Sequence, residues 1–367
     1  MNMGKNCAVF LDRNKMAKQL KEQGKRVLGY FCAYCPEEIV YAAGLVPVRV
    51  FGSHGPYKVA DAYMPDYYCP YARGCLNAGI GGDYDYLDGI VYSYACLHTQ
   101  GAYDSWARQA AFNYTWFIDM PSMVEMPEAI GFLVEELKAF KGSLEEAFGV
   151  RITDAKLEAA IKLCNEERAL LRAIYAQKRD PKPVVSGEEV FSLILDNMVS
   201  AKGEQGLSPF LSELKSRKRP EQKRARMMVL STELDDQRIF AAMENQGVIV
   251  VADNLCTGSR YIWEDVESAG DPLEAIAKRY LLGVNCPLKH PMDRGLSLIE
   301  DMIDGFSVEK AMFIWPQGCD PMGWAVPFIK KMLEGRGIPS CWVTVRGDGG
   351  EDDLAAVAKA TAELIGG

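Results

Sequence analysis

Cysteine is the residue type whose number and placement most suggest chemistry in this sequence. Eleven cysteines stand beside only three histidines. Five of them are expected on loops or at the ends of elements: Cys69, Cys96, Cys256, Cys286 and Cys319. An inert cysteine behaves as a small apolar residue and has no reason to prefer loops. Thiolates with few histidines favour iron–sulfur or zinc over a metal held mainly by imidazole.

The spacing of the cysteines favours a cluster over a structural zinc site. The pair in Cys32-Ala33-Tyr34-Cys35 has no matching second Cys-x-x-Cys pair, so its zinc and redox interpretations are both weak. Cys69 precedes a predicted helix, whose N-terminus favours a thiolate. Dispersed cysteines that the fold brings together suit a cluster on three protein thiolates, with one iron left open for substrate. The remaining cysteines are expected in the core.

Three ionisable residues near these cysteines are candidate catalytic groups for proton transfer. Glu37 and Glu38 follow Cys35-Pro36 at a predicted helix start, where capping and the helix dipole explain at least one of them. His98 lies two residues after Cys96 and is otherwise a polar loop residue. We therefore expect Glu37, Glu38 and His98 either to move protons beside the metal site or to serve only the local structure.

The elements that must position these residues alternate between strand-like and helical patterns. Strands are predicted at 26–34, 47–53, 89–96 and 113–120, and again at 227–233, 247–254, 311–317 and 341–345. The region from 126 to 177 is helical in pattern. This order predicts an α/β protein with two parallel-sheet lobes, at 1–125 and 226–367, around a helical insertion at 126–225. The third strand of each half ends near Cys96 or Cys319, at the sheet edge where ligands bind.

Composition excludes several classes of protein. The 367 residues are 49% hydrophobic and 25% charged, as in a globular protein of more than one domain. A net charge of −9 argues against nucleic acid as a partner. The apolar run at 247–252 is far shorter than the ~20 residues of a membrane span, and Cys7–Leu11 is too short for a signal segment. We expect a cytoplasmic protein without disulfides.

Several segments together resemble the family of 2-hydroxyacyl-CoA dehydratases and benzoyl-CoA reductases, over most of the chain. They are Tyr34-Cys35-Pro36-Glu37-Glu38, Cys69-Pro70-Tyr71-Ala72-Arg73, Cys256-Thr257-Gly258-Ser259-Arg260 and Cys319-Asp320-Pro321. The resemblance implies two flavodoxin-like lobes with a helical insertion. It also implies a [4Fe–4S] cluster on Cys69, Cys96 and Cys319. Leu97 and His98 depart from the family, which usually has Asp after the second cysteine.

The same resemblance implies a function in radical chemistry under anaerobic conditions. A related subunit would complete a homo- or heterodimer, and a separate ATP-dependent iron–sulfur activator would supply a low-potential electron. The chain has no Gly-x-x-x-x-Gly-Lys-Ser/Thr sequence of its own for ATP. The electron would form a ketyl radical on an acyl-CoA, for dehydration of a 2-hydroxyacyl group or benzoyl-type reduction.

Two alternatives to a single catalytic cluster stay open. A double-cubane cluster, with reduction of a small substrate, would need Cys256 and Cys286 as additional ligands and a sixth thiol from Cys75 or Cys35. An electron-relay or scaffolding subunit without catalysis is the other alternative. It is favoured by the segment 346–351, which lacks the Arg-rich ending usual in the family.

Overall fold

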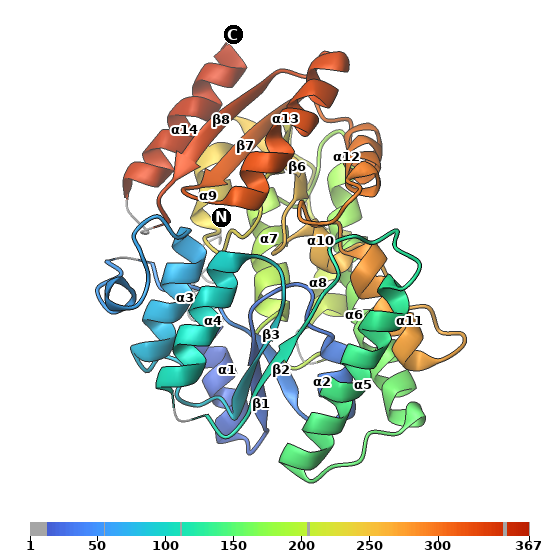
Figure 1. Cartoon of the computed structure of the whole chain (residues 1–367). Coiled ribbons are helices and arrows are strands. Elements are labelled where there is room, and N and C mark those ends of the chain that lie inside the picture. Colours follow the sequence, from blue (N-terminus) through green and yellow to red (C-terminus); the bar gives the residue numbers. More distant parts are fainter. Residues whose placement is uncertain (1–12, 55, 111, 204–205, 348–350, 367) are drawn as a thin grey trace.

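Two parallel sheets organise the chain, as a computed structural model that describes residues 13–54, 56–110, 112–203, 206–347 and 351–366 shows (Figure 1). Their strand orders are β2-β1-β3-β4 and β6-β5-β7-β8. The strands are β1 (Val27–Tyr30), β2 (Val46–Arg49), β3 (Gly89–Ser93), β4 (Thr115–Ile118), β5 (Ala225–Leu230), β6 (Val248–Asn254), β7 (Lys310–Pro316) and β8 (Ser340–Val345). The predicted α/β class with two parallel-sheet lobes is confirmed. The run Cys7–Leu11 lies outside the described residues.

Burial on both faces explains why these strands were recognisable as apolar runs. Every residue of β1, β3 and β6 is buried, because helices cover both faces of each sheet. In each sheet the first and third strands are neighbours, with the second on the far side of the first. Successive strands are therefore added on opposite sides of the first strand. In parallel sheets of this kind, ligands bind in the crevice at the carboxyl ends of the two strands where the order reverses.

The helices of the first lobe lie on the two sides of its sheet (Figure 1). On one side α3 (Pro70–Ile80) packs against α4 (Leu97–Gln109), with α1 (Arg13–Glu22) in the same apolar core. On the other side α2 (Glu37–Ala42) packs against the helical segment that follows β4. The crevice residues after β1 and β3 lie between these two layers.

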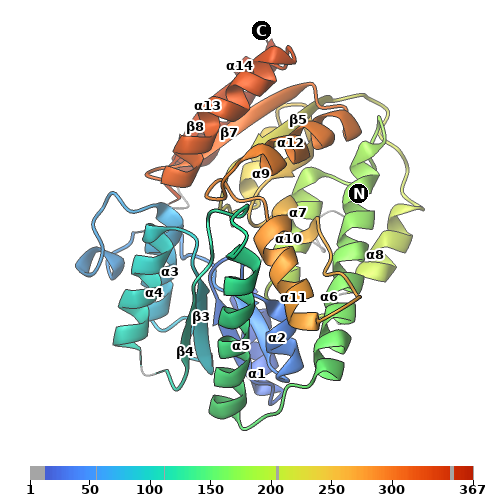
Figure 2. The ribbon, with the colours of Figure 1, turned by 45° about the vertical axis from the view of Figure 1, so that its right-hand side comes forward.

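The helical segment consists of α5 (Ala129–Phe148), α6 (Asp154–Tyr175), α7 (Gly187–Asn197) and α8 (Leu207–Leu214). Gly149 ends α5 in the left-handed conformation with φ of 63°, and the Thr153 side chain accepts a hydrogen bond from the Lys156 N–H at the start of α6. Helix α5 packs against α11 (Pro272–Lys278), which comes from the second half of the chain (Figure 2). The second half therefore helps to cover the first sheet.

The second sheet lies between two further helical layers. Helices α9 (Arg238–Glu244) and α14 (Glu351–Gly366) share one apolar core with α7, while α12 (Asp293–Gly305) and α13 (Asp320–Gly335) belong to the core of the other face. The lobes meet near the carboxyl ends of β2 and β5, where the Gly52 N–H donates to Asp235 Oδ2 at 3.0 Å. No helix within the described ranges is long and apolar enough to cross a membrane.

Candidate metal centre

Three cysteines from distant parts of the chain line one cavity of about 270 Å³, called here the cysteine cavity. Cys69, Cys96 and Cys319 are the residues directly before the first turn of α3, α4 and α13. Cys96 follows β3 and Cys319 follows β7, at the carboxyl ends of the third strands of the two sheets. The fold thus brings together the three cysteines that the family resemblance implies as ligands.

Burial determines the protonation of these three thiols. It raises the pKa of Cys69 and Cys96, and that of Cys319 to about 12. A backbone N–H three residues further along the chain acts to lower each pKa. It belongs to Ala72 for Cys69, to Thr99 for Cys96 and to Met322 for Cys319. Free thiols in this setting keep their protons at neutral pH. A bound cation would favour the thiolates, which the three helix N-termini would then also stabilise.

Polar side chains contact two of the sulfur atoms directly. Thr99 Oγ1 lies 3.2 Å from Cys96 Sγ, and Thr232 Oγ1 lies 3.1 Å from Cys319 Sγ. Hydrogen bonds to sulfur are one means by which a protein tunes the potential of an iron–sulfur cluster. The arrangement suits sulfur atoms that carry negative charge.

His98 contacts the backbone of Cys69, the candidate ligand whose sulfur has no threonine neighbour named above. Its Nδ1 accepts a hydrogen bond from the Cys69 N–H at 3.2 Å, which places the imidazole proton on Nε2. Nε2 lies 3.9 Å from Asp320 Oδ2, and the ring stacks on Tyr68 with centroids 4.4 Å apart. Burial lowers the pKa of His98 against the opposing effect of Asp320. His98 lines the cysteine cavity as a neutral ring whose single N–H proton is on Nε2.

The donor set fits a cluster better than a lone ion. Among the described residues, no three His, Cys, Asp or Glu side chains are arranged to hold a single metal ion. A [4Fe–4S] cluster has different requirements, because each thiolate binds its own iron and the sulfur ligands stand further apart. Three thiols at helix N-termini beside a shared cavity suit such a cluster.

A second group of thiols lies within electrostatic range of the first. Negative charge on Cys286 would raise the pKa of both Cys32 and Cys256. The same charge would raise the pKa of Cys96 and Cys319. Cys286 is therefore within electrostatic range of thiols in both groups.

Buried arginines accompany the second group. Arg260 Nη1 donates to Cys256 Sγ at 3.2 Å, and the Arg260 side chain also contacts Asn254 Oδ1. Arg49 is fully buried and pairs with Glu233 at 2.5 Å. Its Nε and Nη1 atoms have no hydrogen-bond partner among the described residues. These cations would offset negative charge that accumulates on the thiols.

The position of Cys32 was not anticipated as part of this group. Cys75 Sγ contacts the Val50 carbonyl at 3.8 Å in the core of the first lobe, and Cys35 is packed in the core beside α2. Neither occupies the place that Cys32 takes. Cys32 follows β1, which ends at Tyr30, whereas the predicted strand at 26–34 contained it, so the rule that drew attention to Cys96 and Cys319 did not reach it.

Glu37 lies in a buried network of hydrogen bonds and does not line the cysteine cavity. It accepts hydrogen bonds from the Tyr30 hydroxyl at 2.7 Å and the Tyr261 hydroxyl at 2.9 Å. Lys202 Nζ lies 3.1 Å from its Oε2. These partners join the first lobe to the segment after α7 and to α10 (Ser259–Ile262). The geometry shows Glu37 as a buried link between parts of the chain.

Glu38 has a separate set of buried partners. Arg168 Nη2 on α6 donates to it at 2.8 Å, and the Tyr280 hydroxyl donates at 2.8 Å. Burial acts to raise the pKa of Glu38, but Arg168 and Arg279 hold it below its ordinary value. Glu38 is therefore ionised and does not line the cysteine cavity either.

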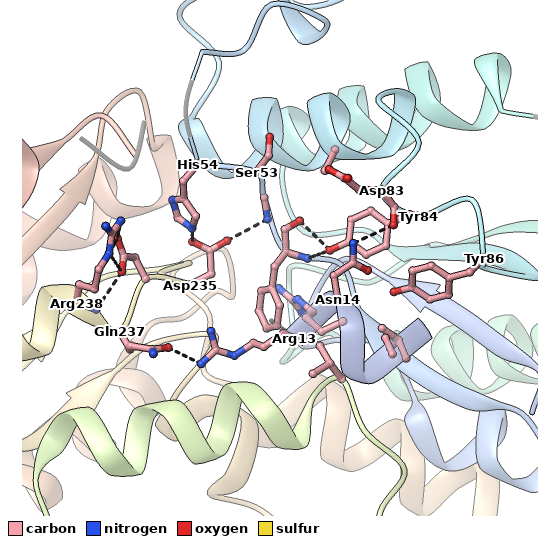
Figure 3. A pocket seen from close by; sticks show the side chains of 18 residues that line it. Arg13, Asn14, Ser53, His54, Asp83, Tyr84, Tyr86, Asp235, Gln237 and Arg238 are labelled. Carbon is pink, nitrogen blue, oxygen red and sulfur yellow. Dashed lines mark hydrogen bonds and ion pairs between the residues drawn. The ribbon is translucent and has the colours of Figure 1, made fainter. Parts of the chain in front are cut away.

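A second cavity, of about 310 Å³, opens between the lobes and contains none of the cysteines (Figure 3). Its polar side chains are paired. His54 with Asp235 at 3.2 Å and Arg13 with Gln237 at 2.5 Å join the two lobes, and Arg238 pairs with Asp236, two residues away, at 2.7 Å. It is slightly larger than the cysteine cavity. We place the chemistry in the cysteine cavity because the thiols converge there.

Comparison with known proteins points to one family. Residues 32–358 match the family described as 2-hydroxyglutaryl-CoA dehydratase, D-component. The chain is 26% identical to a benzoyl-CoA reductase subunit of Thauera aromatica over 318 residues, which cover 83% of this chain and 82% of that protein. It is 27% identical to lactoyl-CoA dehydratase subunit beta of Anaerotignum propionicum over 332 residues, 88% and 87% of the two chains. It is 26% identical to (R)-2-hydroxyglutaryl-CoA dehydratase, subunit beta, of Acidaminococcus fermentans over 335 residues, 88% of each.

Proposed function

The chain belongs to the 2-hydroxyglutaryl-CoA dehydratase D-component family, and on that premise we propose that it is a cluster-bearing subunit of an enzyme acting on an acyl-CoA. The observation that carries the proposal is the convergence of Cys69, Cys96 and Cys319 on one cavity from three helix N-termini. These thiols would hold a [4Fe–4S] cluster. When bound, the cluster supplies single electrons at low potential.

The residues of this chain would bind, shield and adjust the site. Thr99 and Thr232 contact two ligand sulfurs, where their hydroxyls can donate hydrogen bonds and raise the cluster potential. The apolar part of the cavity wall would exclude water from the acyl group, through side chains that include Tyr94, Met120 and Trp324. His98 would present its Nε2 proton at the same wall, where it would be available for proton transfer.

The proposed reaction is one-electron reduction of the acyl group, followed by loss of water from a 2-hydroxyacyl group or by benzoyl-type ring reduction. We propose a related subunit as the stable partner and an ATP-dependent iron–sulfur protein as the electron donor. Support for the partner comes from the relatives, which are named as subunits. Support for the separate donor comes from the missing ATP-binding sequence.

The second thiol group favours a second candidate, a double-cubane cluster that reduces a small substrate. Charge on Cys286 would act on Cys32 and Cys256 and also on Cys96 and Cys319, and Arg260 donates to Cys256. Six thiols would then share two linked cubanes, with Cys32 in the place first considered for Cys75 or Cys35. The buried arginines would offset part of the larger negative charge.

Iron counting on anaerobically purified protein tests these proposals. About four irons per chain would support the single cluster, and about eight would support the double cubane. Cys319→Ala is expected to lose the cluster. Cys75→Ala, a matched change at a buried cysteine away from the cavity, is expected to keep all of its iron. Zinc or no metal in the wild-type protein would overturn both candidates.

Ligand binding at the cluster separates catalysis from electron relay. A catalytic subunit that binds benzoyl-CoA should show a change in the electron paramagnetic resonance spectrum of its reduced cluster when the ligand is added. A relay or scaffolding subunit should show an unchanged spectrum.

A further inference from the structure

Lys289 is a buried lysine that reaches the cysteine cavity from the turn after Cys286. Its residue is only 6% exposed, and it belongs to the wall of the cavity. Nζ donates to the Pro121 carbonyl at 2.5 Å and lies 4.5 Å from the centre of the Tyr34 ring. An ammonium has three N–H groups. One carbonyl and one aromatic face leave its donor capacity partly unused.

The turn holds Lys289 in place. Its backbone N–H donates to the Cys286 carbonyl at 2.9 Å. The next residue is fixed on both sides, since the His290 N–H donates to the Ser122 carbonyl at 2.8 Å and the Val124 N–H donates to the His290 carbonyl at 3.0 Å. Two loops therefore form one continuous wall, and Lys289 differs from a surface lysine whose head is free to extend into water.

Burial of an ammonium without a counterion is costly, so its charge calls for a partner. Within the described part of the chain, no carboxylate forms an ion pair with Lys289 at 4.0 Å or less. Lys202, another buried lysine, meets this requirement through Glu37 at 3.1 Å. Burial lowers the pKa of Lys289 to about 8, against the opposing effect of Cys286 and Cys32. Lys289 also borders an open cavity, where a ligand can accept a hydrogen bond from its ammonium.

The rest of the wall limits what this ligand can be. Most of the lining is apolar or aromatic: Tyr34, Tyr94, Met120, Leu288, Pro321 and Trp324. Lys289 is the only lysine or arginine among the described residues of the wall. A cavity of about 270 Å³ that is shared with the metal ligands admits a compact group and leaves a nucleotide outside. The wall suits a short or single-ring acyl group with one electron-rich oxygen.

We propose that Lys289 is a catalytic residue that donates a hydrogen bond to the carbonyl oxygen of the acyl thioester. This inference rests on the proposed function and names Lys289 as the residue that binds the substrate carbonyl in that reaction. A reduced cluster at this site would supply one electron to the thioester, and the activator would have provided that electron. The C=O π bond would then be reduced, with the unpaired electron on carbon and the negative charge on oxygen. No atom leaves in this step, and the Lys289 ammonium stabilises the new charge on oxygen in a water-poor cavity.

Ligands with and without the carbonyl oxygen test the assignment on the anaerobic complex with its partner subunit. Benzoyl-CoA carries the oxygen, and its thioether analogue S-benzyl-CoA does not. We expect Lys289→Met to weaken benzoyl-CoA binding by about ten- to a hundredfold and to leave S-benzyl-CoA binding within about threefold of wild type, as measured by calorimetry. Lys289→Arg should recover part of the benzoyl-CoA affinity, because it restores the charge.

Two controls keep the outcomes distinct. Lys178→Met removes another buried lysine, which lies over the Tyr175 ring at 3.6 Å at the end of α6, and should leave both affinities unchanged. Equal losses for both ligands in Lys289→Met, or loss of iron from that variant, would overturn the assignment of Lys289 to the carbonyl. A wild-type protein that holds iron and binds neither ligand would instead overturn the benzoyl-type branch of the proposed function, and the role of Lys289 with it.

Discussion

The buried ion pair between Glu38 and Arg168 makes a quantitative prediction about stability. Glu38 is fully buried and Arg168 is 2% exposed, and their side chains meet at 2.8 Å. Glu38→Gln would remove the negative charge and leave the guanidinium buried. Loss of one partner of a buried pair costs about 3–5 kcal/mol, because the remaining charge stays desolvated. Asp265 still lies 3.6 Å from Arg168 Nε, so we expect about 3 kcal/mol.

A double-mutant cycle measures this effect. Glu38→Gln, Arg168→Met and the double variant are unfolded in urea under anaerobic conditions and followed by circular dichroism. The double variant should recover about 2 kcal/mol relative to the sum of the single variants, since neither charge is then left alone. Single losses below about 1 kcal/mol that simply add would refute the reasoning. The same double variant tests the predicted proton transfer by Glu38: lost turnover with retained iron would support that role.

Two further predictions concern contacts between the lobes. Gly318 has φ of 77°, and a side chain there would collide with the Tyr67 carbonyl of the other lobe, so Gly318→Ala should lose about 2–3 kcal/mol and part of its iron. Gly149→Ala is the matched control, because φ is 63° and no neighbour lies within 4 Å. We expect only the backbone cost of about 1 kcal/mol and full iron content. Equal losses in the two variants would contradict the collision. The Asp235 carboxylate raises the pKa of His54 to about 9 from an ordinary 6.5, so the pair should contribute stability in full below pH 6.5 and lose it as pH rises through 9. Because the His54 side chain is 32% exposed, we expect the pair to contribute about 1–2 kcal/mol, measured as the difference in unfolding free energy between pH 7 and 10. At pH 10 the unfolding free energy of the wild-type protein should match that of His54→Gln. A difference between the two proteins that is the same at pH 7 and 10 would contradict the assignment.

Local pattern was sufficient for the strands and for much of the helical framework. The eight predicted strands occur in the structure, with ends that differ by a few residues. The reason is that parallel strands covered on both faces read as short apolar runs bounded by polar turns. The pattern at 126–177 likewise contains α5 and α6. The packing of α11 against the first lobe could not be predicted from the sequence pattern, because contacts between distant segments produce no periodicity in the local sequence.

The carboxylates after Cys35 show where residue type is insufficient. Their position before a helix suggested capping or proton transfer. The structure shows instead that Glu37 meets Lys202 and that Glu38 meets Arg168, partners more than a hundred residues away. A carboxylate and a distant cation carry no sign in the sequence that they will be buried together.

The sequence by itself determined that this is a two-sheet α/β protein and that thiols, more than imidazoles, are available as metal ligands. These properties follow from apolar periodicity and residue chemistry, which are local. Only the tertiary structure decided which thiols converge: it placed Cys69, Cys96 and Cys319 on one cavity, brought Cys32, Cys256 and Cys286 within electrostatic range of one another, and left Cys75 in the core. It also placed the buried Lys289 on the wall of the same cavity, with no carboxylate of the described residues within 4.0 Å of its ammonium. Such choices depend on how the two lobes pack, because convergence in space is a property of contacts between segments and not of the segments themselves.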